Sequence, residues 1–181
     1  MPNQIETERL LLKPPEPADA PRITELMQEE GIPKRLARAP WPYTLSDAEG
    51  WIAANLKARR NGREYSFMIH RAKAGLIGSC GLVVRGRVWE LGFWCGKPWW
   101  GQGFVTEAAE ALLAWARDEH DQDAFIAGHI ADNLGSGRVL EKLGFSPVGE
   151  KKMYVRALDC DVVAVRYALN ATTDEALLNG H

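Results

Sequence analysis

Cysteine is scarce in this chain of 181 residues, which contains only Cys80, Cys95 and Cys160. The three lie far apart and form no C-x-x-C pair, so the sequence offers neither a disulfide framework nor a zinc-binding motif. Dispersed cysteines are typical of proteins kept in a reducing compartment. We therefore expect a cytoplasmic protein without a metal centre.

An excess of charge and long apolar runs are missing as well. The chain has 22 Lys and Arg residues against 24 Asp and Glu residues, a net charge of -2 at neutral pH. Nucleic-acid backbones and anionic membranes bind strongly basic surfaces, so neither is an expected partner. No run is long enough to cross a bilayer, and the segment before Arg9 lacks the apolar stretch of a signal peptide. We expect a soluble protein that holds a small ligand at a local site.

Internal repeats, low-complexity tracts and domain linkers are absent from the sequence too. With 46% hydrophobic residues, the chain is long enough to bury one core. The sequence predicts a single domain over residues 1–170 and a flexible polar tail over residues 171–181.

The apolar residues follow two periods. Alternating or β-rich runs predict strands over residues 9–13, 65–70, 76–84, 88–95, 124–130, 145–148, 153–158 and 162–169. Spacings of three and four residues predict helices that follow Asp19, Ser46, Gly103 and Asn133, with a capping box between Ser46 and Glu49. The strands between residues 65 and 95 are typical of an antiparallel meander. The strand over 124–130 can pair parallel to the strand over 88–95, because a helix separates the two.

Two glycines open the third of these helices, in the stretch from Trp100 to Thr106. A glycine has no Cβ, so the backbone amides of Gly101, Gln102 and Gly103 can approach an anion at the positive end of the helix. The same glycines can also form a plain tight turn between strand and helix. The residues alone leave both interpretations open.

Four segments, taken together and in this order, resemble the GNAT acyltransferase superfamily, and most closely its RimJ/RimL-like branch. The segments are ETERLLL at residues 6–12, ELGFW at 90–94, WGQGFVTEA at 100–108 and NLGSGRVLEKLGF at 133–145. The resemblance implies an α/β (α+β) fold. Such a fold has a mixed, mostly antiparallel seven-stranded sheet with a splayed central strand pair and helices on both faces.

The resemblance also implies acetyl-coenzyme A as the acyl donor. Its diphosphate would lie on the glycine turn, and its pantetheine arm would enter the gap between the splayed strands. The residues implied in cofactor binding are Phe93, Trp94, Cys95, Trp100, Gly101, Gln102, Gly103, Phe104, Val105, Thr106, Asn133 and Ser136. Pro98 stands where the family usually has glutamine or arginine, so the turn would bind through backbone amides without a side-chain contact at that position.

Glu90 is the one carboxylate within an otherwise apolar strand, so it lies either at a solvated face or toward a site. In several GNAT branches a glutamate on the corresponding strand is the general base, because an amine must lose its proton before it attacks a thioester. The resemblance likewise places Ser136 near the sulfur, where it would support the leaving thiolate. Leu140 stands where many branches have a tyrosine, so a tyrosine acid at that position is excluded.

Trp41 and Tyr43 occupy a proline-rich loop that in the family helps to wall the acceptor pocket. Together with Glu90 they are candidates for acceptor binding, and the alternative is that they anchor the loop to the core. Cys95 has the chemistry of a nucleophile, but no motif places a histidine or aspartate beside it, which favours a buried strand residue.

These features predict an N-acetyltransferase that transfers an acetyl group to a primary amine by direct attack in a ternary complex. The expected acceptor is a protein N-terminal α-amine or a small-molecule amine. The alternative is an acyl-coenzyme A sensor that binds without turnover. A dinucleotide-binding motif is excluded, because Thr106 stands where its third glycine would be. The sequence does not choose between a monomer and a homodimer.

Overall fold

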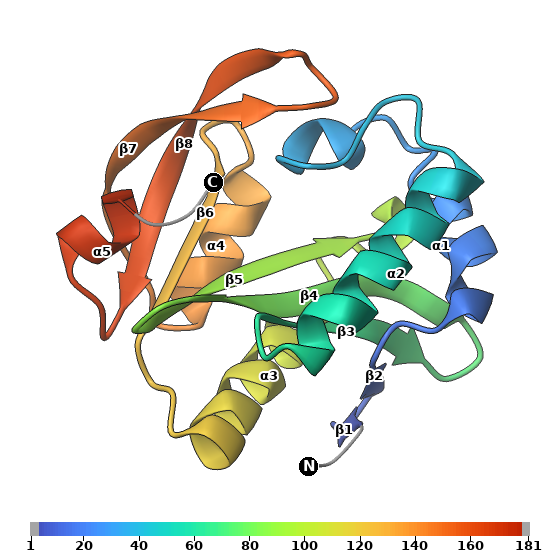
Figure 1. Cartoon of the computed structure of the whole chain (residues 1–181), viewed down its shortest axis with the longest axis horizontal. Helices are drawn as coiled ribbons and strands as arrows, with labels where there is room; N and C mark the ends of the chain where they lie inside the picture. The colour runs from blue at the N-terminus through green and yellow to red at the C-terminus, as the bar shows by residue number, and fades with distance from the viewer. Residues whose placement is uncertain (1–3, 179–181) are drawn as a thin grey trace.

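The computed structural model describes residues 4–178 and is built on one mixed eight-stranded sheet with the order β1-β2-β3-β4-β5-β6-β8-β7 (Figure 1). The strands are β1 (Ile5–Glu6), β2 (Leu10–Lys13), β3 (Glu64–Arg71), β4 (Gly75–Arg85), β5 (Val88–Cys95), β6 (Phe125–Ile130), β7 (Ser146–Val155) and β8 (Cys160–Leu169). The helices are α1 (Ala20–Leu26), α2 (Leu45–Arg60), α3 (Phe104–His120), α4 (Leu134–Lys142) and α5 (Thr173–Leu178), with 3-10 helices η1 (Pro17–Asp19), η2 (Pro33–Arg35) and η3 (Lys97–Trp99).

The helices cover the two faces of the sheet in different groups. α3 and α4 pack on the face to which Leu91 of β5 points. α1 and α2 cover the opposite face through a cluster that includes Ile52 and Met68. α5 lies on this second face as well, where Ala176 packs against Ile126 of β6. Successive residues of a strand point to opposite faces, and helices cover both faces of this sheet. The central strands are therefore apolar on both sides and form nearly continuous hydrophobic runs in the sequence.

The predicted meander is confirmed. β3, β4 and β5 are antiparallel neighbours, with Phe67 opposite Cys80 and Cys80 opposite Phe93. β6 pairs parallel to β5 on its other edge, as expected for a strand that follows a crossover helix.

The sheet has one strand more than the seven that the family resemblance implies. The additional strand is β1, which pairs with β2. β1 is only two residues long, so no periodic pattern in the sequence could reveal it. The runs predicted separately at residues 145–148 and 153–158 belong to a single strand, β7. Its ladder with β8 shifts register between Pro147 and Gly149. An irregularity of this kind breaks the alternation of period two, so one strand reads as two.

The N-caps of two helices differ from those predicted. α2 begins after Thr44 rather than Ser46. The Thr44 hydroxyl accepts from the backbone N–H of Asp47, whose carboxylate accepts from the N–H of Thr44. Asp19 makes no side-chain cap on α1, because its carboxylate accepts from the backbone N–H of Glu16 instead. The capping motif of α2 was therefore predicted correctly in kind and two residues too late.

Thr44→Ala is expected to lower the free energy of unfolding by about 1 kcal/mol, since it removes an acceptor for an N–H group at the start of the helix. Ser46→Ala is the matched control, because Ser46 is exposed in the first turn of the same helix, and its expected change is within about 0.5 kcal/mol. Urea unfolding of the two variants measures the difference. Equal losses would contradict Thr44 as the cap.

Part of the C-terminal segment predicted to be flexible forms helix α5. Ala176 is fully buried, and its carbonyl accepts from Arg166 Nε at 3.1 Å. Thr172 and Glu175 form reciprocal hydrogen bonds at the start of the helix. Six residues do not form a stable helix alone, so its contacts with β7 and β8 hold it in place. The last residues of the predicted tail, 179–181, lie outside the described residues.

β5 and β6 separate before either strand ends. Their register ends with Leu91 opposite Ala127, although β5 continues to Cys95 and β6 to Ile130. On its other edge β5 stays paired with β4 as far as Cys95. The predicted splay is therefore present, and the gap begins at Gly92.

Candidate active site

The gap between β5 and β6 begins with two exposed glycines. Gly92 and Gly128 directly follow the last register pair of the two strands. A Cβ added to Gly92 would meet no atom within 4 Å. The gap thus opens beside a β5 residue without a side chain, and an extended ligand arm can enter there to pair with a strand edge.

Two hydrogen bonds fix which way the backbone groups of β5 point. The N–H of Trp89 donates toward the β6 side, to the Ala124 carbonyl at 3.1 Å, and the N–H of Gly96 donates toward β4, to the Ile77 carbonyl at 2.8 Å. Backbone direction alternates along a strand. Odd-numbered residues of β5 therefore face β6, and even-numbered residues face β4.

Of the three β5 residues predicted to hold a pantetheine arm, Phe93 and Cys95 direct their backbone groups into the gap. Trp94 directs its own toward β4. The Cys95 carbonyl already accepts from the indole N–H of Trp100 at 2.6 Å. Phe93 is therefore the residue of β5 best placed to pair with a ligand in the gap.

The turn after β5 contains two glycines in the left-handed conformation. Gly101 has φ 73° and Gly103 has φ 80°, values that favour glycine over any residue with a side chain. A Cβ added to Gly101 would meet no atom within 4 Å. Gly103 is the N-cap of α3, and Gln102 closes the turn by donating to the Pro98 carbonyl at 2.8 Å. The N–H groups at the start of α3 and the open space beside the turn fit a diphosphate.

Asn133 and Ser136 lie at the start of α4. Asn133 is the N-cap residue of this helix but makes no side-chain capping bond, and its Nδ2 donates to Ser136 Oγ at 2.9 Å. Ser136 accepts in this bond, so the hydrogen of its hydroxyl is left for another partner. α4 follows the carboxyl end of β6 and the turn follows the carboxyl end of β5. Since the ends of parallel strands meet at one edge, both lie at the wide end of the gap.

Glu90 is buried rather than solvated, with 7% of its surface exposed. Its Oε1 accepts from Arg166 Nη2 at 3.0 Å and its Oε2 accepts from Arg85 Nε at 3.2 Å. Arg166 is itself 1% exposed and lies against Gly128, where an added Cβ would be 2.4 Å from its Nη1. The geometry favours a positioning role, in which Glu90 holds Arg166 at the closed end of the gap. The general-base role stays a prediction.

Glu90 and Ser136, the two predicted catalytic residues, belong to opposite faces of the sheet. Strand alternation places the Glu90 side chain on the face covered by α1, α2 and α5, whereas α4 packs on the other face. The two side chains can act on one ligand only through the gap.

Tyr43 is a core residue rather than part of an acceptor pocket. Its side chain packs in the cluster under α1 and α2, and burial, together with the Asp47 carboxylate, raises its pKa to about 12. Its carbonyl accepts from Gln28 Nε2 at 3.0 Å. The burial of Tyr43 fits the alternative interpretation, in which its side chain anchors the loop to the core. Trp41 is half-buried, so part of the residue stays accessible.

Cys95 is not available as a nucleophile. Burial raises the pKa of its thiol to about 12, although a hydrogen bond with the Gly96 backbone opposes this effect, so the thiol is protonated at neutral pH. We expect iodoacetamide at neutral pH to alkylate the exposed Cys160 and to leave Cys95 and the buried Cys80 unmodified. Peptide mass spectrometry measures this, and alkylation of Cys95 in the folded protein would contradict it.

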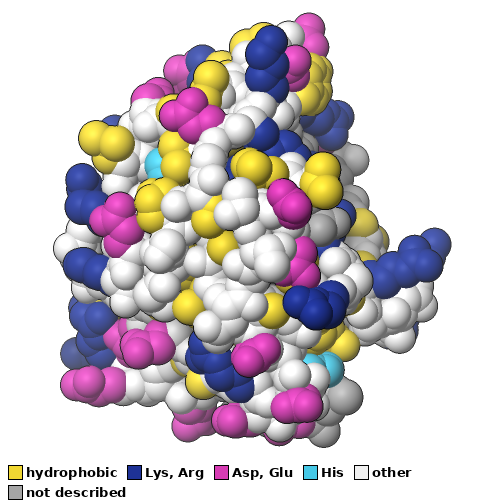
Figure 2. Space-filling view, turned by 90° about the vertical axis from the view of Figure 1, so that its left-hand side faces the viewer, with side chains coloured by type: hydrophobic (Ala, Val, Ile, Leu, Met, Phe, Trp, Pro, Cys, Tyr) yellow, Lys and Arg dark blue, Asp and Glu magenta, His cyan; other side chains and the backbone are white. Residues whose placement is uncertain are grey.

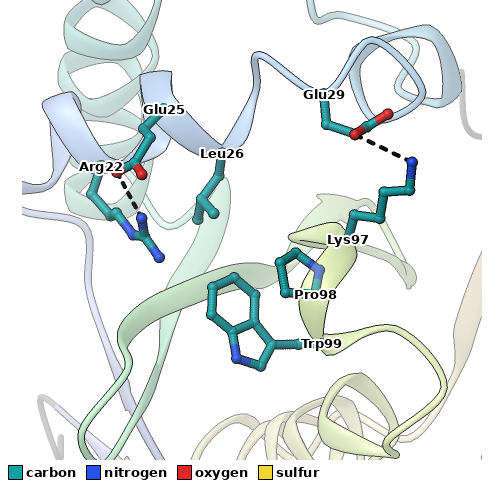
Figure 3. Close-up of a pocket in the computed structure, with 7 residues that line it drawn as sticks. All are labelled: Arg22, Glu25, Leu26, Glu29, Lys97, Pro98 and Trp99. Carbon is teal, nitrogen blue, oxygen red and sulfur yellow. Dashed lines mark hydrogen bonds and ion pairs between the residues drawn. The ribbon is translucent and has the colours of Figure 1, made fainter.

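A pocket of about 390 Å³ lies between α1 and η3, beside the glycine turn (Figure 3). Its charges are paired: Arg22 with Glu25 at 2.6 Å and Lys97 with Glu29 at 3.4 Å. The Arg22 guanidinium also lies 5.6 Å from the ring centroid of Trp99. The pocket contains none of the predicted site residues. The bond from Lys97 to Glu29 ties the segment after α1 to the base of the turn.

The surface carries charges of both signs. Figure 2 shows Lys and Arg side chains interspersed with Asp and Glu over the face it presents. Within residues 4–178, no helix combines the length and apolarity that crossing a membrane requires. Over the same residues, no group of three His, Cys, Asp or Glu side chains is arranged to hold a metal ion.

Two arginines at this site were missed in the sequence. Arg166 stands within an apolar strand, and a lone charge in such a strand requires a buried partner of opposite sign, as Glu90 does. Because each is the lone charge of opposite sign in an apolar strand, an ion pair between Arg166 and Glu90 could have been predicted from the sequence. Arg9 lies in the segment ETERLLL (residues 6–12), and its side chain donates a hydrogen bond to Glu107 of the segment WGQGFVTEA (residues 100–108). The spacing of residues along the sequence does not reveal this contact.

Residues 9–146 match the family model described as the acetyltransferase (GNAT) domain. The chain belongs to the GNAT acetyltransferase family. It is therefore an acyltransferase, and the family uses acetyl-coenzyme A as its acyl donor.

Among its relatives, the "Putative ribosomal N-acetyltransferase YdaF" of Bacillus subtilis (strain 168) is 28% identical over 168 residues, which cover 89% of this chain and 90% of that protein. The ribosomal protein uS5-alanine N-acetyltransferase of Escherichia coli (strain K12) is 25% identical over 84% of this chain and 82% of that protein. A solved structure of RimL, a ribosomal L7/L12 alpha-N-protein acetyltransferase in complex with coenzyme A, has the same fold, with a TM-score of 0.81 at 17% identity over 91% of this chain and 96% of that chain.

Proposed function

We propose that the protein transfers the acetyl group of acetyl-coenzyme A directly to a primary amine, with both substrates bound together. The observation that carries this proposal is the separation of β5 from β6 beside the glycine turn. Gap, turn and the start of α4 meet at one edge of the sheet. Donor and acceptor held there would react as neighbours, and holding two reactants in the right geometry lowers the barrier to such a transfer.

Each group at this edge has a role in the proposal. The amides around Gly101 and Gly103 bind the diphosphate, and the backbone of Phe93 pairs with the pantetheine arm. Acetyl-coenzyme A supplies the activated acetyl group. The amine nitrogen bonds to the acetyl carbon, the C–S bond breaks, and the proton that the nitrogen loses ends on the coenzyme A thiol. Ser136 donates a hydrogen bond to the departing sulfur, which lowers the cost of the charge that develops there. The protonated thiol of Cys95 supports direct transfer over an acetylated cysteine.

We propose a protein N-terminal α-amine as the acceptor, and a small-molecule amine as the alternative. The relatives named as ribosomal-protein N-acetyltransferases, which align over most of this chain, support the first choice. Acceptors of that kind are made in the cytoplasm, the compartment that the cysteine content predicts. Trp41 is partly exposed, and its large aromatic side chain is of the kind that can contact an acceptor.

The experiment incubates the purified protein with acetyl-coenzyme A and pairs of peptides that are identical except for a free or a blocked N-terminus. Release of free thiol and acetylation found by mass spectrometry only on the unblocked peptides would support the proposal. Acetylation of small amines but of no peptide would show that the acceptor is a small-molecule amine, which is the alternative. Tight binding of coenzyme A without thiol release from any amine would favour the sensor hypothesis and contradict the enzyme.

A further inference from the structure

The side chain of Arg9 connects the N-terminal segment to the glycine turn. Its Nη1 donates to the carbonyl of Gln102 at 3.2 Å, and its Nε donates to Glu107 Oε2 at 2.6 Å. A Cβ added to Gly103 would lie 3.5 Å from Arg9 Nη2, so the guanidinium runs alongside the turn. Arg9 is thus in contact with both the turn and the first turn of α3.

The bond to Gln102 fixes the direction of a neighbouring N–H. In a trans peptide the carbonyl of one residue and the N–H of the next point in opposite directions. A Gln102 carbonyl held toward Arg9 therefore turns the Gly103 N–H away from the guanidinium. Glycines at 101 and 103 permit other orientations at little cost, so the turn needs an external contact to keep this one.

Glu107 holds Arg9 in the orientation that this contact requires. Glu107 Oε1 accepts from the Thr7 hydroxyl at 2.6 Å and from the Arg9 backbone N–H at 2.9 Å. Burial opposes ionisation of this carboxyl, but the hydrogen bonds from Thr7 and Arg9 and the charge of Arg9 lower its pKa overall. Arg9 also offsets a negative charge that would otherwise repel an anion at the start of α3.

We propose that Arg9 is a positioning residue for coenzyme A binding: it locks the Gln102–Gly103 peptide so that the Gly103 N–H faces the diphosphate, and Glu107 and Thr7 hold Arg9 in place. This inference rests on the proposed use of the turn as the diphosphate site. It gives the segment ETERLLL a function that its place at the edge of the sheet does not suggest.

Arg71 separates this mechanism from a plain effect of charge. The guanidinium carbons of Arg9 and Arg71 lie 4.5 and 4.8 Å from the ring centroid of Phe104, so both cations flank the start of α3. Within the part of the chain that the structure describes, the Arg71 side chain makes no hydrogen bond to the turn. A charge effect predicts equal losses for the two arginines, and a peptide lock predicts a loss for Arg9 alone.

The test measures the dissociation constant of coenzyme A by calorimetry for the wild type and for Arg9→Lys, Arg9→Ala, Glu107→Gln and Arg71→Ala. Each protein is held well below its melting temperature. We expect about tenfold weaker binding for both Arg9 variants, since a lysine keeps the charge but not the fork, and a smaller loss for Glu107→Gln. Arg71→Ala is expected to bind within about twofold of the wild type.

The kinetic readout is KM, with the amine as an internal reference. The Arg9 variants are expected to raise KM for acetyl-coenzyme A while KM for the amine stays constant. A lower melting temperature with unchanged coenzyme A affinity would reduce Arg9 to a structural residue and overturn the inference. Equal losses for Arg9→Ala and Arg71→Ala would overturn it as well. If the wild type itself binds no coenzyme A, the proposed function fails and the inference fails with it.

Discussion

Replacing Gly103 by alanine is expected to weaken coenzyme A binding by about ten- to a hundredfold and to lower the free energy of unfolding by about 1–2 kcal/mol. Gly103 has φ 80°, where an L-residue is strained, and the nearest atom to an added Cβ is 3.5 Å away. The loss therefore comes from backbone conformation rather than from a clash. Relaxation of that strain moves the N–H groups at the start of α3, which are those that would hold the diphosphate.

Gly86→Ala is the matched control for this substitution. Gly86 has φ 68° in the connection between β4 and β5, and a Cβ added there would meet no atom within 4 Å. It carries the same kind of strain without lying at the turn, so its stability loss is expected to match that of Gly103→Ala while coenzyme A binds unchanged. Calorimetry and urea unfolding measure the two quantities separately. Parallel changes in affinity for both variants would argue against the turn as the binding site.

Arg166→Met is expected to cost about 3–5 kcal/mol of unfolding free energy, because it leaves the Glu90 carboxylate buried beside Arg85 without its closest partner. That loss is a large share of the 5–15 kcal/mol typical of a domain. Glu90→Leu combined with Arg166→Met removes both charges and is expected to recover most of the loss. Urea unfolding of the single and double variants measures the coupling.

The pH profile of Glu90→Gln separates the two roles of this residue. If Glu90 only positions Arg166, activity falls with stability, and the shape of the plot of kcat/KM against pH is that of the wild type. If Glu90 is instead the general base, the substitution removes the acidic limb of the profile, because that limb records protonation of the base in the free enzyme. We expect the first result from the paired geometry of the carboxylate.

The positions of the strands and the glycine turn were predictable because they follow from local rules. The alternation of β3, β4 and β5 is written into successive residues, and the left-handed φ values at residues 101 and 103 require glycine. The cap of α2 was two residues off since Thr44 and Ser46 offer the same chemistry. The six-residue helix α5 was missed because its stability comes from the sheet beneath it.

The sequence did not contain the contacts that the predicted site residues make across the fold. The sequence marked Glu90 as a lone carboxylate in an apolar strand, but it did not show that Arg166, 76 residues away, fills the space beside the carboxylate. Tyr43 was a candidate for acceptor binding because in the family its loop helps to wall the acceptor pocket, whereas the packing of α1 and α2 buries its side chain. Trp94 was expected to direct its backbone into the gap. The backbone groups of β5 alternate in direction along the strand, and those of Trp94 point toward β4.

By itself, the sequence determined the family, the order of the central strands and the place of the turn, since each depends on neighbouring residues or on an ordered set of motifs. Only the tertiary structure decided which partners meet across the fold. Sheet register brings Arg166 to Glu90, and docking of the N-terminal segment brings Arg9 to Glu107, 98 residues away. Such pairs are chosen by packing over the whole chain, so no local pattern contains them.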